Sequence, residues 1–209
     1  LTNAEIHTRK AWVISMDIKD FFPTTKISRV KECLKTELDD HSSDFLDLVI
    51  DLCCLDDSLP QGAPTSPHLA NICFKKLDEK LLEYSNQHDL AYSRYADDMT
   101  FSGQEIPDNI ETTIEEIIAC NGYKLARKKT KLMAQKDRQS VTGLVVNDKV
   151  SVPRKLRKLL RAISHDTQAN GWGYAISRSS LIDSENQYWG YMALQKMVKQ
   201  KIAGEIPKN

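Results

Sequence analysis

Two adjacent aspartates, Asp97 and Asp98, lie in the segment SRYADDMTFSG between two runs of residues that are typical of β-strands. Carboxylates are the ligands that Mg²⁺ prefers, and two divalent ions about 3.5–4 Å apart can activate an attacking oxygen and stabilise a leaving oxygen in phosphoryl transfer. One pair of carboxylates cannot surround two ions, so Asp17, at the end of the apolar run AWVISMDI, is the natural third ligand. The structural alternatives are a hairpin turn for the pair and a helix cap for Asp17.

The charges are divided unequally along the chain. Residues 1–120 hold 23 Asp/Glu and 11 Lys/Arg, whereas residues 121–209 hold 6 and 18. Thirteen basic residues lie between Lys124 and Arg161, where only Asp137 and Asp148 are acidic. An acidic half followed by so basic a segment predicts a polyanionic partner beside a site for divalent cations. The alternative is a solvated basic surface without a partner.

The cysteines and the apolar runs indicate the cellular compartment of the protein. Five cysteines are scattered without a CxxC pair, which suits a reducing cytoplasm. No apolar run approaches the roughly 20 residues of a membrane span, and the first ten residues lack the core of a signal peptide. We therefore expect a cytoplasmic protein without a membrane partner.

The hydrophobic pattern predicts strands and helices in mixed order. We expect a strand at 11–18, helices at 25–38 and 44–55, and a third helix after the breaker-rich loop SLPQGAPTSP, followed by a hairpin around Asp97 and Asp98. Beyond it we expect a helix at 107–121, short strands near 124–126, 130–134, 140–146 and 149–152, and helices from Pro153 and over 184–203. Hairpins mixed with helices favour an α+β domain to about residue 150, followed by a small helical subdomain.

Several segments resemble the conserved motifs of reverse transcriptases. MDIKDFFPT, LPQGAPTSPHLAN and YSRYADDMTFSG are similar to successive palm motifs, in the order and spacing of bacterial enzymes related to those of group II introns. NAEIH, with Asn3, Ala4 and His7, and the VTG at 141–143 resemble two elements of retron reverse transcriptases. The resemblance implies a palm over residues 1–150, with an antiparallel sheet, packed helices and a hairpin like a primer grip, and a helical thumb over 151–209.

The resemblance also implies the catalytic roles. Asp17, Asp97 and Asp98 would hold two Mg²⁺ ions, or Mn²⁺ in their place, with the Ile18 carbonyl as a further ligand. Lys129 would bind the triphosphate or protonate the leaving pyrophosphate, a role for which its neighbours Lys128 and Lys131 are alternatives.

The nucleotide-binding roles follow in the same way. Phe22 would lie under the sugar and exclude a 2′-hydroxyl, and Gln61 would contact the incoming nucleotide. Asp20 and Phe21 would line the triphosphate path mainly through their backbone amides. As structural alternatives, the two phenylalanines are core residues and Gln61 is a turn residue. Tyr95 either packs beneath the primer end or fills the core.

The helix from Pro153 would be the thumb element that holds the phosphates of template and primer. Its basic residues on the outward side are Arg154, Lys155, Arg157, Lys158 and Arg161. Phosphate contacts position a duplex without reading its sequence, and RNA is recognised through its shape and 2′-hydroxyls. The implied partners are a structured RNA that serves as template and primer, the RNA–DNA duplex, dNTPs and, in a role such as antiviral defence, an effector protein. Aromatic residues near the end either stack on bases or pack in the core: Trp172, Tyr174, Tyr188, Trp189 and Tyr191.

The N-terminal part departs from the family pattern, because residue 1 falls immediately before the NAxxH element and no fingers region precedes it. We expect a fragment of a longer protein, and we expect the isolated chain to polymerise poorly; strong primer extension by this chain alone would contradict that. The alternatives are a group II intron-like or other bacterial reverse transcriptase, or a non-catalytic RNA-binding module that keeps a palm scaffold.

Overall fold

The computed structural model describes residues 2–38, 42–170 and 185–203. The chain divides into two compact units, Lys10–Ala134 and a second unit of Leu1–Arg9 with Gln135–Asn209. This division differs from the boundary expected near residue 150, since the first nine residues and the segment after residue 134 share one unit. The assignment of the parts to palm and thumb stays a prediction, and each unit is described by itself.

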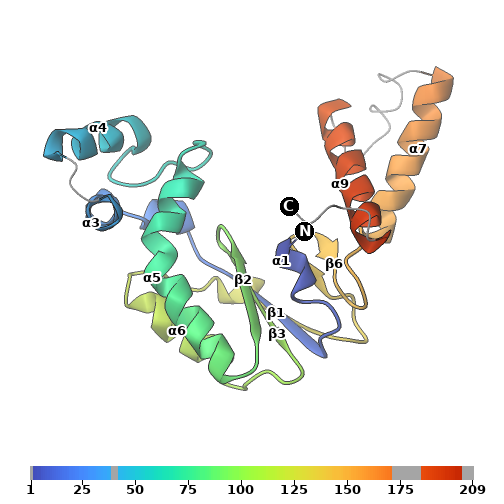
Figure 1. Cartoon of the computed structure of the whole chain (residues 1–209), viewed down its shortest axis with the longest axis horizontal. Coiled ribbons are helices and arrows are strands. Elements are labelled where there is room, and N and C mark those ends of the chain that lie inside the picture. Colours follow the sequence, from blue (N-terminus) through green and yellow to red (C-terminus); the bar gives the residue numbers. More distant parts are fainter. Residues whose placement is uncertain (1, 39–41, 171–184, 204–209) are drawn as a thin grey trace. The chain divides into compact units, whose positions relative to one another are not determined.

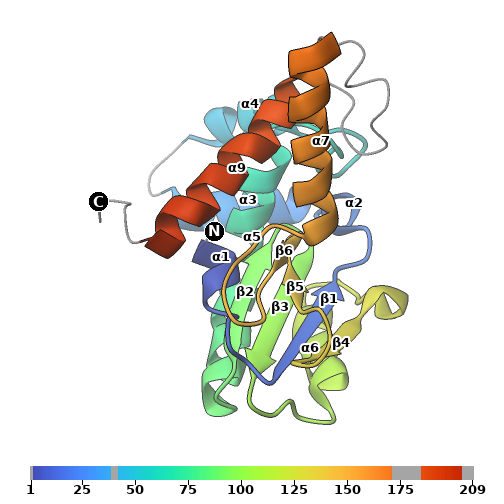
Figure 2. The same ribbon diagram turned by 90° about the vertical axis from the view of Figure 1, so that its right-hand side faces the viewer.

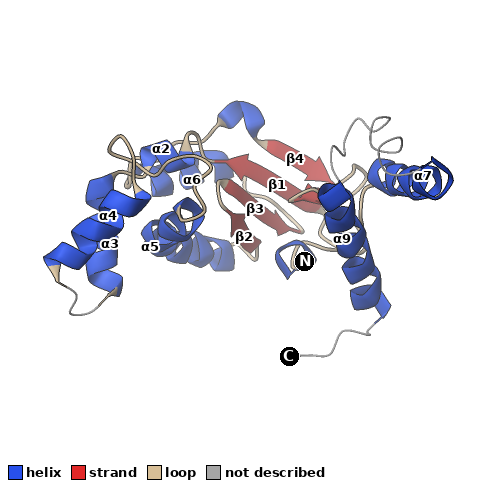
Figure 3. Ribbon diagram, turned by 90° about the horizontal axis from the view of Figure 1, so that it is seen from above, coloured by secondary structure: helices blue, strands red, loops and turns tan. Residues whose placement is uncertain are grey.

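The Lys10–Ala134 unit is built on a four-stranded antiparallel sheet in the order β2-β3-β1-β4 (Figure 3). Its strands are β1 (Trp12–Asp17), β2 (Ala91–Tyr95), β3 (Asp98–Gly103) and β4 (Lys131–Ala134). The central strand β1 pairs with β3 from Trp12 opposite Gly103 to Asp17 opposite Asp98. The sheet therefore brings the end of β1 against the start of β3, although the two lie far apart in the sequence.

One face of this sheet forms the main hydrophobic core. Side chains alternate between the faces of a strand, and the residues at every second position, such as Ile14 and Met16 in β1 and Met99 and Phe101 in β3, are almost completely buried. They form one cluster with buried residues of two long helices, α5 (Ser66–Gln87) and α6 (Ile110–Ala119). The antiparallel sheet with packed helices confirms the expected α+β class.

Shorter helices complete the Lys10–Ala134 unit. They are α2 (Phe21–Thr24), α3 (Ile27–Glu37), α4 (Ser43–Cys53) and the 3₁₀ turn η1 (Arg127–Lys129). Helix α4 begins where sequence predicts, because the Ser42 side chain caps it by accepting a hydrogen bond from the Phe45 N–H. Helix α5 carries Pro67 in its first turn, a position at which the missing N–H of proline costs nothing.

Three of the expected strands differ in the structure. Residues 124–126 contribute a single bridge between Ile18 and Leu125 and then turn into η1, so the pairing with β1 resumes only at β4. The run at 140–146 is divided, because Thr142 and Gly143 adopt positive φ angles of 45° and 80°. They form the turn between β5 (Ser140–Val141) and β6 (Leu144–Val145). Residues 149–152 form only a bridge, from Ser151 to Val145.

The second unit joins the N-terminal segment to this hairpin. Helix α1 (Thr2–Glu5) leads to His7, which is fully buried, and the Arg9 N–H donates to the Asn147 carbonyl at 2.7 Å. The Asn147 side chain also donates to the carbonyls of Gln135 and Asp137 and accepts from the Gln139 N–H. The two retron-like elements, NAEIH and VTG, therefore lie in the same compact unit.

Among the described residues that follow in the same unit are the helices α7 (Arg154–Asn170) and α9 (Glu185–Ala203), which lie side by side in Figures 1 and 2. Leu160 and Ile163 of α7 are buried in a small cluster with Tyr191 and Met192 of α9. Among the residues that the structure describes, no helix has the length and apolar character needed to cross a membrane.

Candidate active site

The hairpin between β2 and β3 places Asp97 and Asp98 beside the end of β1. Tyr95 and Asp98 are the last paired residues, so Ala96 and Asp97 form a two-residue turn. The Ile18 N–H donates to the Asp97 carbonyl at 2.9 Å, and Asp98 lies directly opposite Asp17. Residues directly opposite on antiparallel strands point to the same face, with Cβ atoms about 4.5–5.5 Å apart. The hairpin turn expected for the pair is present, and this turn lies beside Asp17; the metal-binding role of the three carboxylates stays a prediction.

The turn is strained at Ala96. Its φ angle of 53° lies in the left-handed region, which residues with a Cβ atom avoid. A glycine or asparagine would be the common choice for such a position. Strained backbone of this kind persists only where the surrounding structure fixes it, and it is concentrated at functional sites.

Burial and neighbouring charges both act on Asp98. Partial burial raises the pKa of its carboxyl group, and the negative charges of Asp17 and Asp97 raise it further. A hydrogen bond from the Ser15 hydroxyl to Asp98 Oδ1, at 3.0 Å, and the positive charge of Lys131 act in the opposite direction. Burial is the largest cause of the raised pKa of Asp98, and the charges of Asp17 and Asp97 add to it.

Lys129 is the lysine that contacts these carboxylates. Its Nζ donates to Asp17 Oδ1 at 2.8 Å, and this contact raises the pKa of the lysine, with smaller contributions from Asp97 and Asp20. Lys131, on β4, faces the sheet position of Ser15. The structure therefore favours Lys129 over its neighbours as the cation nearest to the acidic cluster.

The residues fit a divalent cation by their chemistry, although their side chains are engaged with protein partners. Across residues 2–38, 42–170 and 185–203, no three His, Cys, Asp or Glu side chains are arranged as ligands around one metal ion. Asp17 instead faces Lys129, and Asp98 faces Ser15. Three carboxylates whose charges oppose one another are nevertheless a hard-oxygen donor set that a divalent cation would stabilise.

The expected nucleotide-binding residues lie in two segments, the start of α2 and the loop before α5. Asp20, with a φ of 48°, is exposed and precedes α2, in which Phe22 is half-buried with its ring 5.3 Å from that of Phe21. The Phe21 side chain belongs to the core, between the rings of Phe74 and Tyr123.

Gln61 and Tyr95 both expose their side chains. Gln61 lies in the loop before α5, where the Ser66 hydroxyl donates to the Pro60 carbonyl at 2.6 Å. Tyr95 is 69% exposed and opposite Asp98, so it does not fill the core. That Phe22 and Gln61 line one cleft with the aspartates stays a prediction.

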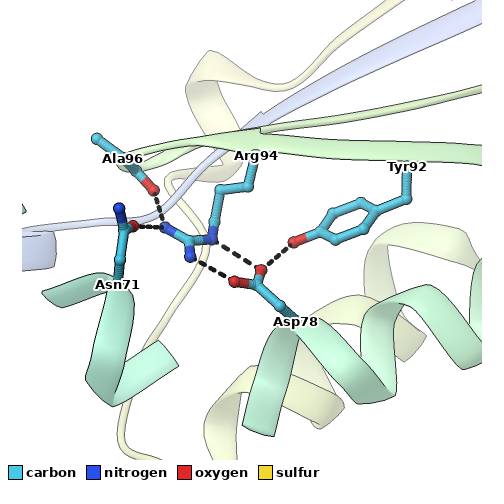
Figure 4. A network of polar contacts seen from close by, with 5 residues as sticks. All are labelled: Asn71, Asp78, Tyr92, Arg94 and Ala96. Carbon is cyan, nitrogen blue, oxygen red and sulfur yellow. Dashed lines mark hydrogen bonds and ion pairs between the residues drawn. The ribbon is translucent and has the colours of Figure 1, made fainter. Parts of the chain in front are cut away.

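Arg94 is a residue that sequence reasoning missed. Its side chain leaves β2 on the core face and is only 6% exposed, and Figure 4 shows its guanidinium group bound between α5 and the turn. It donates to both carboxylate oxygens of Asp78, to the Asn71 side chain and to the Ala96 carbonyl. The signal in the sequence is the spacing of Asn71, Phe74 and Asp78, which places them on one face of a helix.

The basic residues of α7 are arranged as expected. All five are exposed, whereas Leu156 and Leu159 pack partly against the buried pair of Leu160 and Ile163. The five are Arg154, Lys155, Arg157, Lys158 and Arg161. Of the aromatic residues, Tyr191 packs against this cluster and Trp189 is 53% exposed, while Trp172, Tyr174 and the Tyr188 side chain lie outside the described residues.

Comparisons with known proteins agree with the motifs. Residues 1–147 match the family model described as reverse transcriptase (RNA-dependent DNA polymerase). The chain is similar to the retron Ec86 reverse transcriptase of Escherichia coli, with 34% identity over 79% of this chain and 52% of the relative. It is also similar to the retron Mx65 reverse transcriptase of Myxococcus xanthus, with 29% identity over 99% of this chain and 51% of the relative. The chain thus spans about half the length of these curated relatives.

A solved structure supports the fold. Apo telomerase from Candida tropicalis, truncated from its C-terminal domain, aligns with a TM-score of 0.51 at 14% identity, over 68% of this chain and 35% of that chain. At so low an identity the similarity concerns the fold alone.

Proposed function

Since the chain belongs to the reverse transcriptase family and resembles its retron members, we propose that it forms the palm and thumb of a retron-type RNA-directed DNA polymerase. The observation that carries the proposal is the pairing of Asp17 with Asp98 beside the turn at Asp97. A binding module has no use for three carboxylates gathered where their charges oppose one another. A metal-dependent polymerase needs such carboxylates to bind its metal ions.

The proposed reaction extends a nucleic acid primer. A primer hydroxyl attacks the α-phosphorus of a dNTP, the new phosphodiester bond forms, and the bond to pyrophosphate breaks. Two Mg²⁺ ions bound by Asp17, Asp97 and Asp98, with the Ile18 carbonyl, would supply activation of the attacking oxygen and stabilisation of the leaving one. By family resemblance the first primer group would be a 2′-hydroxyl of a structured RNA.

The chain's own residues would orient the nucleotide and protonate the leaving pyrophosphate, while the proton of the attacking hydroxyl would pass to solvent water. Lys129, now paired with Asp17, would turn to the triphosphate and donate a proton to the leaving pyrophosphate. Phe22 would close the space that a ribose 2′-hydroxyl needs, and Gln61 would contact the nucleotide. The amides of Asp20 and Phe21 would line the triphosphate path.

The basic residues of α7 would hold the template–primer duplex by its phosphates. Their full exposure and shared charge support this proposal, since contacts to phosphate need no particular register. The partners would be a structured noncoding RNA, its RNA–DNA product and dNTPs, in a bacterial cytoplasm, with an effector protein in a defence role.

The test is template-directed dNTP incorporation by the full-length protein with the noncoding RNA encoded next to it. Replacing Asp97 and Asp98 together by Asn removes two charges with little change of shape, and we expect activity to fall by about 10³-fold or more. Asp89→Asn is the matched control: Asp89 is exposed at the other end of β2 and has a φ of 54°, which Asn tolerates. Equal activity of the double variant and the wild type would refute the proposed mechanism.

A further inference from the structure

Arg94 contacts the turn before Asp97, helix α5 and helix α2. Its Nη1 donates to the Ala96 carbonyl in the turn at 2.9 Å and to Asn71 Oδ1 at 3.0 Å. Its Nε and Nη2 donate to the two carboxylate oxygens of Asp78 at 2.8 and 2.5 Å. The third segment is α2, because the guanidinium carbon lies 5.7 Å from the centre of the Phe21 ring.

Several contacts with α5 fix the position of the Arg94 guanidinium group. Asn71 and Asp78 lie two turns apart on the same face of α5, and Phe74 between them carries the guanidinium over its ring at 4.4 Å. Tyr92 donates to the same Asp78 carboxylate at 2.7 Å (Figure 4). A planar fork with several donors is needed to satisfy these partners together.

Stability alone does not explain this ion pair, in which the Arg94 side chain is 6% exposed and the Asp78 side chain 33% exposed. Removing two charges from water costs about as much as their attraction returns, and well-packed apolar residues can replace such a pair without loss. An apolar side chain could fill the space between β2 and α5, but it could not bind the carbonyl of Ala96. That carbonyl belongs to the residue held at a φ of 53°, directly before Asp97.

The contacts of α5 extend the connection to the nucleotide-binding loop. Helix α5 begins at Ser66, whose hydroxyl binds the Pro60 carbonyl next to Gln61. The helix therefore carries the Gln61 loop at its start and the partners of Arg94 within its next turns. In α2, Phe21 packs against Phe22, with ring centres 5.3 Å apart.

We propose that Arg94 is a positioning residue that fixes the strained turn at Ala96, and with it the metal-binding carboxylates Asp97 and Asp98, relative to α5 and α2. This inference rests on the proposed function. The side chain does not touch substrate or metal; it holds the turn through one carbonyl while α5 holds the side chain. Loosening it would misplace Asp97 and Asp98 and weaken metal binding without removing any ligand.

The informative variant is Arg94→Lys in the full-length protein. Lysine keeps the charge and can pair with Asp78, but a single ammonium group cannot also reach the Ala96 carbonyl in the same geometry. We expect the Mg²⁺ concentration for half-maximal dNTP incorporation to rise about tenfold. The single-turnover rate at saturating Mg²⁺ should fall about 10–100-fold, since small misplacements of reacting groups have effects of this size. Mn²⁺ binding, followed by electron paramagnetic resonance without substrates, should weaken in parallel.

Tyr92→Phe is the matched control, because it removes a hydrogen bond from the same Asp78 carboxylate and does not touch the turn. We expect it to lower the melting temperature while leaving the Mg²⁺ midpoint and Mn²⁺ affinity unchanged. Should Arg94→Lys fail to fold, Asn71→Ala removes one partner of Nη1 and leaves the Asp78 pair, and it should shift both metal readouts in the same direction by a smaller factor.

The outcomes separate this inference from the proposed function. Unchanged metal readouts in folded Arg94→Lys, or the same shift in Tyr92→Phe, would overturn the positioning role even if the polymerase is active. If the double Asn variant at the turn is as active as wild type, the proposed function fails, whereas Mn²⁺ binding still tests Arg94 because it needs no polymerase activity.

Discussion

The acidic end of the sheet and the basic face of α7 carry opposite charges, and they are built in opposite ways. Asp17 and Asp98 are fixed by strand register, and Asp97 is fixed by its backbone bond to Ile18 and by Arg94 through Ala96. The basic residues of α7 project from one helix into solvent, and only the spacing of a helix orders them. We therefore expect function at the sheet to depend on the position of each carboxylate. On α7 we expect it to depend more on the number of basic residues than on the position of any one of them.

The largest effect on a single residue should be at Lys129. Lys129→Met is expected to lower the rate of dNTP incorporation by about 100-fold, the scale of a lost general acid, because no other lysine is bonded to Asp17 among the residues that the structure describes. Lys128→Met, in the same 3₁₀ turn, should stay within a few-fold of wild type. Single-turnover kinetics at saturating dNTP measure the rates of both variants. An equal loss of rate in the two would contradict a specific role for the position of Lys129.

Substitution of Phe22 tests whether function also depends on the position of individual side chains in α2. Phe22→Ala opens the space proposed to exclude a 2′-hydroxyl, and the preference for dNTP over rNTP should fall about 10–100-fold in competition assays. Phe21→Leu is the control, because the Phe21 ring is buried in the core. It should lower stability by about 1 kcal/mol and leave sugar selectivity intact. Loss of selectivity in Phe21→Leu alone would reverse the assignment of the two rings.

Single changes on α7 should have small and similar effects. Arg157→Gln and Lys158→Gln are each expected to weaken binding of an RNA–DNA duplex a few-fold and to lower the slope of log affinity against log salt by about 1. Fluorescence anisotropy across a salt series measures both values. A much larger loss at one of these positions than at the others would mean that α7 is as geometrically fixed as the sheet.

The smallest effect concerns stability in the absence of metal. The raised pKa of Asp98 means that the folded protein holds this proton more tightly than the unfolded chain. The contribution of this proton to the free energy of unfolding is therefore fully present below the unfolded pKa, near 3.8. It is lost as pH rises through the raised pKa of the folded protein. Asp98→Asn keeps an oxygen acceptor for Ser15 and removes the charge. Its melting temperature with chelator should exceed that of wild type at neutral pH, and the gap should close toward pH 3.

Local patterns were sufficient for most elements of the fold. The short apolar run of β1 and the period-four spacing in α5 reflect contacts that core-facing strands and helices make, so these elements could be predicted from nearby residues. The turn at Thr142 and Gly143 was missed because a β-branched residue rarely takes a positive φ, and only the pairing of β5 with β6 holds it there. The family resemblance favours Lys129 but leaves Lys128 and Lys131 as alternatives, and only the structure distinguishes them, through the contact between Lys129 and Asp17.

The sequence by itself determined the chemistry of this protein: which carboxylates, aromatic rings and basic residues are present, their order, and their resemblance to reverse transcriptase motifs. These are properties of residue type and spacing, which folding does not alter. The tertiary structure decided which groups meet. Asp17 faces Asp98 because the strands pair in that register, Lys129 reaches Asp17 through the turn after Leu125, and Arg94 binds Ala96 because α5 holds it there. Such contacts join residues distant in the chain, and only the packing of the sheet against its helices sets them.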